Sequence, residues 1–162
     1  MSRFDNEIRV SWSVLDRLID SDPNESLDPP RSQSASLAEL KLSVRRDLEW
    51  LLNTRCHAEN VDGSLEEAPK SVVFYGLPDF TSVSAKSSAE QDRMSKAIEN
   101  ALAYFEPRFS GLKVSMEPVS NVDRSLKFRI EATLEVEPTP EAVVFDTVLQ
   151  LGSGNFAVSS SI

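Results

Sequence analysis

The sequence has only one cysteine, one histidine and five glycines in 162 residues, and each shortage excludes a kind of site. One cysteine allows no disulfide within the chain, which fits a reducing compartment. Cys56 and His57 are neighbours, so their side chains diverge, and the sequence offers no other cysteine or histidine for a zinc site or a serine triad. The glycines are scattered or lie in predicted turns, which excludes a phosphate-binding loop. We therefore expect no metal and no cofactor.

Positive charge and long apolar runs are also scarce. Lysine and arginine number 17 against 26 aspartates and glutamates, which gives a formal charge of −9. Nucleic acids and anionic membrane surfaces need basic patches, so neither is expected as the main partner. There is no run of 18 apolar residues, and the N-terminus has no signal-peptide pattern. With 40% hydrophobic residues, the expectation is a soluble cytoplasmic protein with one core.

The 26 acidic residues do not by themselves indicate an enzyme. A glycosidase needs two carboxylates across a cleft, one of them protonated to act as the acid. Glu106 is the natural nominee, but the nearby Arg108 favours the ionised carboxylate, which is the wrong state for a general acid. The chain is therefore not expected to be an enzyme.

Two long helices are expected where apolar residues recur at steps of three and four. The first begins at Ser36 with a capping box and ends near residues 53–55. The second begins at Ser87 and stops before Pro107, because proline disfavours helical geometry in the preceding residue. Trp50 lies off the apolar stripe of the first helix, so it either packs at the border of the core or faces a partner.

The first 35 residues are expected to lie outside the main domain. A short amphipathic helix there carries its apolar residues on one face, namely Val14, Leu15, Leu18 and Ile19. Residues 20–34 are dense in aspartate, proline and serine and are predicted to form a flexible linker. The short helix docks either on its own domain or on a partner. The predicted division is an arm and linker over 1–35 and a folded domain over 36–162.

Strict alternation over eleven residues predicts the clearest strand. From 126 to 136 the apolar residues fall on even numbers and the polar ones on odd numbers. Further strands are predicted at 112–117, 141–151 and 155–158, and residues 71–77 form either a brief strand or an ordered loop on the core. The predicted fold class is α+β, with two long helices and a short N-terminal helix packed on a mostly antiparallel sheet.

A stiff corner joins the second long helix to the next strand. Pro107 fixes the backbone between Glu106 and Arg108, and side chains two apart in an extended segment point the same way. The corner would present an acid and a base together, flanked by Phe105 and Phe109. Two interpretations stay open. The arginine either pairs within its own domain as an internal helix cap, or forms a rigid, exposed polar corner offered to another protein.

Five segments occur in an order that resembles one family of secretion proteins. They are SVLDRL at 13–18, SVRRDLEWLLNTR at 43–55, YGLPDF at 75–80, EPR at 106–108 and FDT at 145–147. On these residues the chain is similar to the TssE family, the baseplate subunit of bacterial type VI secretion systems. That family is itself similar to the small wedge protein of contractile phage tail baseplates. The resemblance covers nearly the whole chain.

The resemblance implies a non-enzymatic assembly part with a compact α+β fold. Members join the wedge made with TssF and TssG, and the corner of Glu106, Pro107 and Arg108 is implied to contact the core bundle of that wedge. The fold also resembles the strand-exchanging part of the sheath subunit, so the family is implied to start sheath polymerisation. The implied location is cytoplasmic, in a baseplate docked at the inner membrane.

The strand at 141–151 is expected to receive the sheath. It is long and β-branched, and such a strand at a sheet edge is a template for pairing with another chain. The candidate contacts are Val144, Asp146 and Val148, which are predicted on the face of the strand opposite to that of Phe145. The segment 155–158 is the next candidate strand. Two other functions stay open: a lysozyme-like lytic enzyme, and a regulatory binding module, because a stress-response anti-adapter shares this fold.

Overall fold

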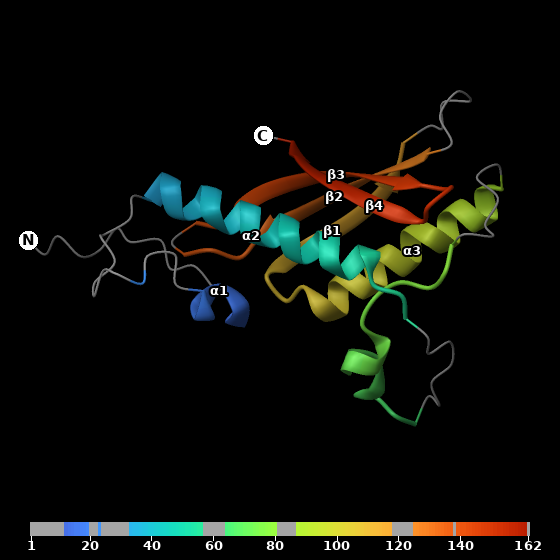
Figure 1. Ribbon diagram of the computed structural model, residues 1–162, viewed down its shortest axis with the longest axis horizontal. Coiled ribbons are helices and arrows are strands. Elements are labelled where there is room, and N and C mark those ends of the chain that lie inside the picture. The colour runs from blue at the N-terminus through green and yellow to red at the C-terminus, as the bar shows by residue number, and fades with distance from the viewer. Residues whose placement is uncertain are drawn as a thin grey trace, which may run out of the picture.

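Two long helices lie on one face of a four-stranded antiparallel sheet (Figure 1). The computed structural model describes residues 12–19, 23, 33–56, 64–80, 87–117, 125–137 and 139–161. The strands lie in chain order and are β1 (Phe109–Met116), β2 (Ser125–Leu134), β3 (Glu141–Gln150) and β4 (Asn155–Ser161). The helices are α1 (Val14–Leu18), α2 (Gln33–Asn53) and α3 (Ser88–Phe105). The predicted α+β class is confirmed.

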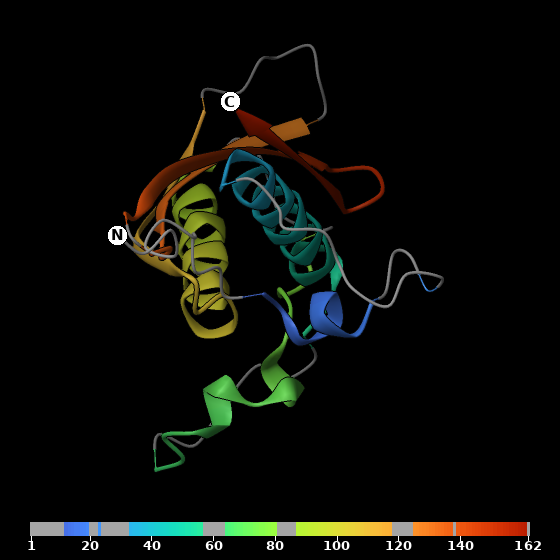
Figure 2. The same ribbon diagram turned by 90° about the vertical axis from the view of Figure 1, so that its left-hand side faces the viewer.

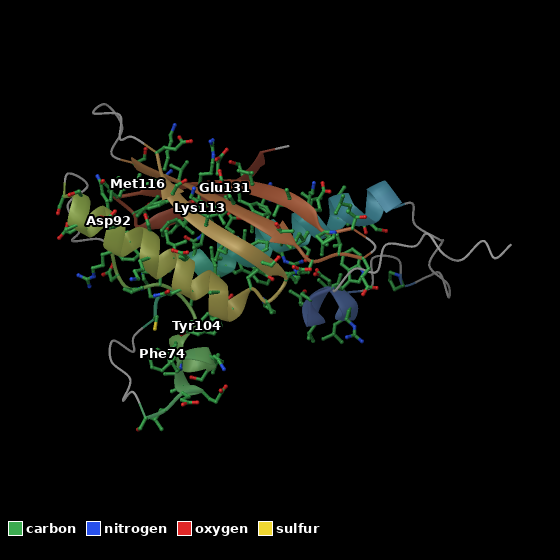
Figure 3. The ribbon with its side chains drawn as sticks, turned by 180° about the vertical axis from the view of Figure 1, so that it is seen from behind. Phe74, Asp92, Tyr104, Lys113, Met116 and Glu131 are labelled. Carbon is green, nitrogen blue, oxygen red and sulfur yellow. The ribbon has the colours of Figure 1, made fainter. Side chains whose placement is uncertain are left out.

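The sheet has one face covered by helices and one open face (Figure 2). α2 packs against β4, and α3 packs against β1. Seen from behind, Lys113 of β1 and Glu131 of β2 lie side by side, as register partners on the open face (Figure 3). The polar side chains gather on the open face, and the core lies between the sheet and the helices.

Among the described helices, none is both long and apolar enough to cross a membrane.

The core is built from the faces that alternation and helical spacing predict. On β2 the even-numbered residues are buried, as expected, and on β3 the odd-numbered ones are. Burying each large apolar side chain contributes about 1.5–3 kcal/mol before the entropy cost. The largest fully buried side chains are Phe128, Phe145, Leu40, Leu48, Leu52, Leu77, Met94, Ile98, Leu102, Leu126, Ile130 and Leu134. Thr147 is also fully buried, and its hydroxyl donates to the Phe128 carbonyl at 3.1 Å, so its polar group is satisfied.

The helix starts differ from the predictions. α2 begins at Gln33, three residues before the expected capping box at Ser36. α3 has Ser87 as its N-cap, as expected, but the Ser87 side chain makes no capping hydrogen bond. Most of the predicted linker over 20–34 lies outside the described residues.

The segment before α3 forms a small lobe that projects away from the sheet (Figure 2). It holds two 3-10 helices, η1 (Ala68–Lys70) and η2 (Val72–Phe74). The prediction of a strand or of an ordered loop on the core at 71–77 is therefore wrong for the first half of that segment. Val72 is 83% exposed, whereas Leu77 is fully buried. Figure 3 labels Phe74 in η2 and Tyr104 near the end of α3. Only the second half of the apolar run enters the core.

Deleting residues 1–28 is expected to leave a cooperatively folding domain. α1 contains no buried residue and is held on α2 by Asp16, which pairs with Arg46 at 2.8 Å and bonds Ser43. This partly exposed contact contributes about 1 kcal/mol or less. Equilibrium denaturation of the truncated and full chains measures the difference. A molten or insoluble truncated protein would contradict the division at residue 35.

The contribution of α1 should depend on pH. Burial acts to raise the pKa of Asp16, but hydrogen bonds from Ser43 and Ser13 and the Arg46 guanidinium hold it below its ordinary value of 3.8. When the pKa of an acid is lower in the folded state than in the unfolded state, its ionised form stabilises the fold at pH values above the unfolded-state pKa. That stabilisation is lost as the pH falls through the folded-state pKa. The difference between the full and truncated chains should therefore be present at neutral pH and shrink below pH 3.8.

Candidate functional site

The predicted corner lies where α3 ends and β1 begins. Glu106 is the C-cap of α3, and its N–H donates to the Leu102 carbonyl at 2.9 Å. The carbonyl of Arg108 accepts from the Glu135 N–H at 2.9 Å, which ties the far side of the corner to the sheet. Pro107 between them is exposed. The corner is therefore fixed to a helix on one side and to the sheet on the other.

Glu106 and Arg108 form a bidentate ion pair. The Arg108 Nε and Nη2 atoms each lie 2.5 Å from a carboxylate oxygen of Glu106, and Nη2 also lies 2.8 Å from Asp47 Oδ2 on α2. Arg46 continues the network: its Nη2 is 2.9 Å from Asp47 and 2.8 Å from Asp16 on α1. One ionic chain thus links α1, α2 and the corner. Fork-shaped pairing of this kind fixes geometry as well as charge.

The network shifts the pKa values of Arg108 and of the neighbouring Tyr75. Burial acts to lower the pKa of Arg108, but hydrogen bonds and charge from Glu106, and then from Asp47, raise it above its ordinary value. Burial also raises the pKa of Tyr75, and the charges of Asp47 and Glu106 add to this effect. Both shifts reinforce the states that these groups already have near neutral pH, a charged Arg108 and a neutral Tyr75.

A groove of about 330 Å³ opens beside the corner, between α1, α2 and the end of α3. Its apolar lining comes from Trp12, Val14, Leu48, Trp50, Leu51, Tyr75, Phe105 and Pro107, and its polar lining from Ser13, Asp47, Glu106 and Arg108. Tyr75 and Phe105 meet edge to face at 5.2 Å, and the Arg46 guanidinium lies 5.1 Å from the centre of the Trp50 ring. Aromatic walls around a few fixed polar groups are typical of a site that takes up another molecule's side chains.

The expectation of an exposed acid and base at this corner is wrong. The Arg108 side chain is only 11% exposed and that of Glu106 only 5%, because each is enclosed by the other and by α2. The internal-pairing interpretation matches these contacts, with Asp47 as the further acid. Phe105 lines the groove as a flanking residue, but Phe109 points into the core, 6.0 Å from the Phe145 ring.

The prediction that 141–151 forms a sheet edge is also wrong. β3 is an interior strand, hydrogen-bonded to β2 on one side and β4 on the other, because β4 runs to Ser161 and covers it. Val144, Asp146 and Val148 are partly exposed on the open face, away from the corner. The Asp146 carboxylate accepts from Arg129 Nε at 2.9 Å. The structure thus separates the predicted site residues into two surfaces.

Asp47 and Tyr75 also belong to the site, although the sequence did not predict either as a site residue. Asp47, Trp50 and Leu51 stand three and four positions apart on α2, so helical spacing alone places them on one side. That this side meets the corner depends on packing between segments 61 positions apart. Tyr75 lies outside the helices, so no helical spacing could have placed it beside the corner.

The described residues thus form an α+β domain with a buried ionic corner, an aromatic groove beside it and an open sheet face. Residues 38–139, well over half of the chain, match the family model described as baseplate wedge protein gp25, and the chain belongs to that family. Proteins of this family are structural, non-enzymatic components of contractile tail-like systems and bind other wedge subunits in a heteromeric assembly. No curated protein matches the chain.

Proposed function

We propose that this chain is the TssE-type wedge subunit of a type VI secretion system. TssF and TssG are its wedge partners, the sheath is its second partner, and it acts in a cytoplasmic baseplate docked at the inner membrane. The groove beside Glu106, Pro107 and Arg108 carries the proposal, because the resemblance assigns the wedge contact to these three residues and the groove lies directly against them.

The groove suits a helix of the TssF and TssG core bundle. Its floor is a set of paired charges that cannot move independently, and its rim offers Trp50, which is 52% exposed, and the exposed Pro107. Partly exposed tryptophans beside a pocket are frequent anchors of protein interfaces. In this proposal the ion pairs hold the shape of the site, and the aromatic rim supplies the contact area.

Replacing Trp50 with glutamate should weaken wedge assembly without unfolding the domain. The side chain is half exposed, so the change removes little core, yet loss of an interface anchor costs about 2 kcal/mol or more, roughly a thirtyfold loss of affinity. Leu42→Glu is the matched control, since Leu42 is 55% exposed on the same helix but does not line the groove. Co-purification with TssF and TssG is the readout. Equal recovery of both variants would contradict the groove as the wedge site.

The sheath is proposed to add a strand to β4. The sheet ends in β1 and β4, and β1 is interrupted by a bulge between Ser110 and Lys113, where Gly111 has a φ of 60°. Bulges and lysines are common protections of edge strands. β4 pairs with β3 without a break, and its exposed side chains Ala157 and Ser159 are small and uncharged. β4 is therefore the edge better suited to pairing with another chain.

Val144, Asp146 and Val148 keep a role in this proposal as contacts for side chains of the added strand. Strands in a sheet lie about 4.8 Å apart, so an added strand would lie about two spacings from β3. The register partners of Asp146 and Val148 on β4 are the small residues Ser159 and Ala157.

A further inference from the structure

The edge of β4 is closed at one end by the last residue of α2. The Phe156 N–H donates to Asn53 Oδ1 at 2.9 Å, and Asn53 Nδ2 donates to the Phe156 carbonyl at 2.9 Å. The same amide nitrogen also donates to the Glu49 carbonyl at 2.8 Å, which fixes its orientation on α2. The Asn53 side chain thereby makes the pair of hydrogen bonds that a residue of a neighbouring strand would make.

This contact reveals which backbone groups face outward. Both polar groups of Phe156 point away from β3, so its pair with Leu149 is one without direct hydrogen bonds. By the alternation of an antiparallel strand, the backbone groups of Val158 and Ser160 also face outward. Among the described residues, no side chain bonds to the outward groups of Val158. Within the described part of the chain, the edge is therefore occupied at Phe156 and has no hydrogen-bond partner from Val158 onward.

A second side chain, that of Arg55, bonds to the turn that precedes β4. Arg55 Nη2 lies 2.6 Å from the Gly154 carbonyl, two residues before Phe156. The segment that carries Asn53 and Arg55 is itself pinned, because the Leu77 N–H donates to the Thr54 carbonyl and the Cys56 N–H to the Leu77 carbonyl, both at 2.9 Å. Both side chains thus project from a fixed segment against the start of β4.

We propose that Asn53, supported by Arg55, sets the register of the strand that adds to β4. This rests on the proposed pairing of β4 with a strand of the sheath. With Asn53 in place, the added strand can bond β4 only from Val158 on. A slip of two residues would keep the same faces but move the partner by about 6.7 Å, so side-chain alternation alone does not prevent it. Asn53 blocks that slip by occupying the position.

The first test uses the isolated chain and amide hydrogen exchange. Asn53→Ala should speed exchange of the Phe156 amide about tenfold, since one hydrogen bond that protects it is lost. Asn53 is exposed, so the variant should fold. Thr54→Ala is the matched control: it loses a side-chain bond to the Trp50 carbonyl in the same helical turn, and among the described residues Thr54 has no hydrogen bond to β4. Unchanged exchange at Phe156 in Asn53→Ala would overturn the inference.

The second test adds the sheath subunit from the same cells. In the wild type, protection should appear at Val158 and Ser160, with no further gain at Phe156. In Asn53→Ala, new protection should spread to Phe156 as the strand takes a second register. Protection limited to Val158 and Ser160 in both proteins would overturn the register role alone. No protection at Val158 in the wild type would overturn the sheath contact on β4, and this inference with it.

Discussion

Arg108→Ala should lower the free energy of unfolding by about 3–5 kcal/mol, because it leaves a buried carboxylate without its counter-ion. Glu106 is 5% exposed, and Arg108 supplies two of its hydrogen bonds at 2.5 Å from the side chain. The remaining backbone donor, the N–H of residue 108, is 3.4 Å away and cannot replace them. A loss of this size is a large part of the stability of an ordinary domain. Chemical denaturation measures it.

Two controls separate burial from charge. Arg129 also pairs with two acids, Asp146 and Glu117, but on the open face of the sheet, so Arg129→Ala should barely change stability. Neutralising both partners, as Glu106→Gln with Arg108→Met, should cost less than Arg108→Ala, since no unpaired charge remains at the cap. If Arg108→Ala unfolds at the same denaturant concentration as the wild type, the ionic corner is not a structural lock.

Gly76→Ala should cost about 2–5 kcal/mol from backbone strain and overpacking together. Gly76 has a φ of 115°, which residues with a side chain rarely adopt. A Cβ atom there would lie 2.5 Å from the Thr54 carbonyl oxygen and 2.8 Å from its carbon, both backbone atoms that the Leu77 bridge holds in place. Neither clash can be relieved by turning a side chain.

The matched control is Gly152→Ala. A Cβ at Gly152 would meet nothing within 4 Å, so stability should change by less than about 0.5 kcal/mol. Denaturation midpoints of the two variants give the comparison. Similar midpoints would mean that the close approach of the lobe to the end of α2 is not maintained in solution. Because the same segment carries Asn53, Gly76→Ala should also speed exchange at the Phe156 amide.

The parts of the fold that follow from local pattern could be predicted from the sequence. On β2 alternation identified the buried face, from Leu126 to Leu134, because a strand with one wet side alternates strictly. Met94, Ile98 and Leu102 were predictable as the buried face of α3 from their helical spacing. Pro107 was predicted to end that helix, and α3 ends at Phe105.

The parts that depend on contacts between distant segments could not be predicted. The partner of Arg108 on α2 lies 61 positions away, so the burial of the corner has no local signal. Whether β3 or β4 forms the edge depends on the order of strands, and both read as ordinary strands in sequence. Val72 and Val73 look like core residues by type, but they form a 3-10 helix on the surface of a projecting lobe.

The most direct test of the proposed function is purification of the tagged full-length chain from its native cells under mild conditions, with the bound proteins identified by mass spectrometry. TssF and TssG are expected in the eluate of the wild type and of Leu42→Glu, and both should be lost from that of Trp50→Glu. Sheath subunits should accompany them when assembly proceeds. Recovery of a response-regulator adaptor in place of these proteins, or clearing of peptidoglycan by the pure chain, would contradict it.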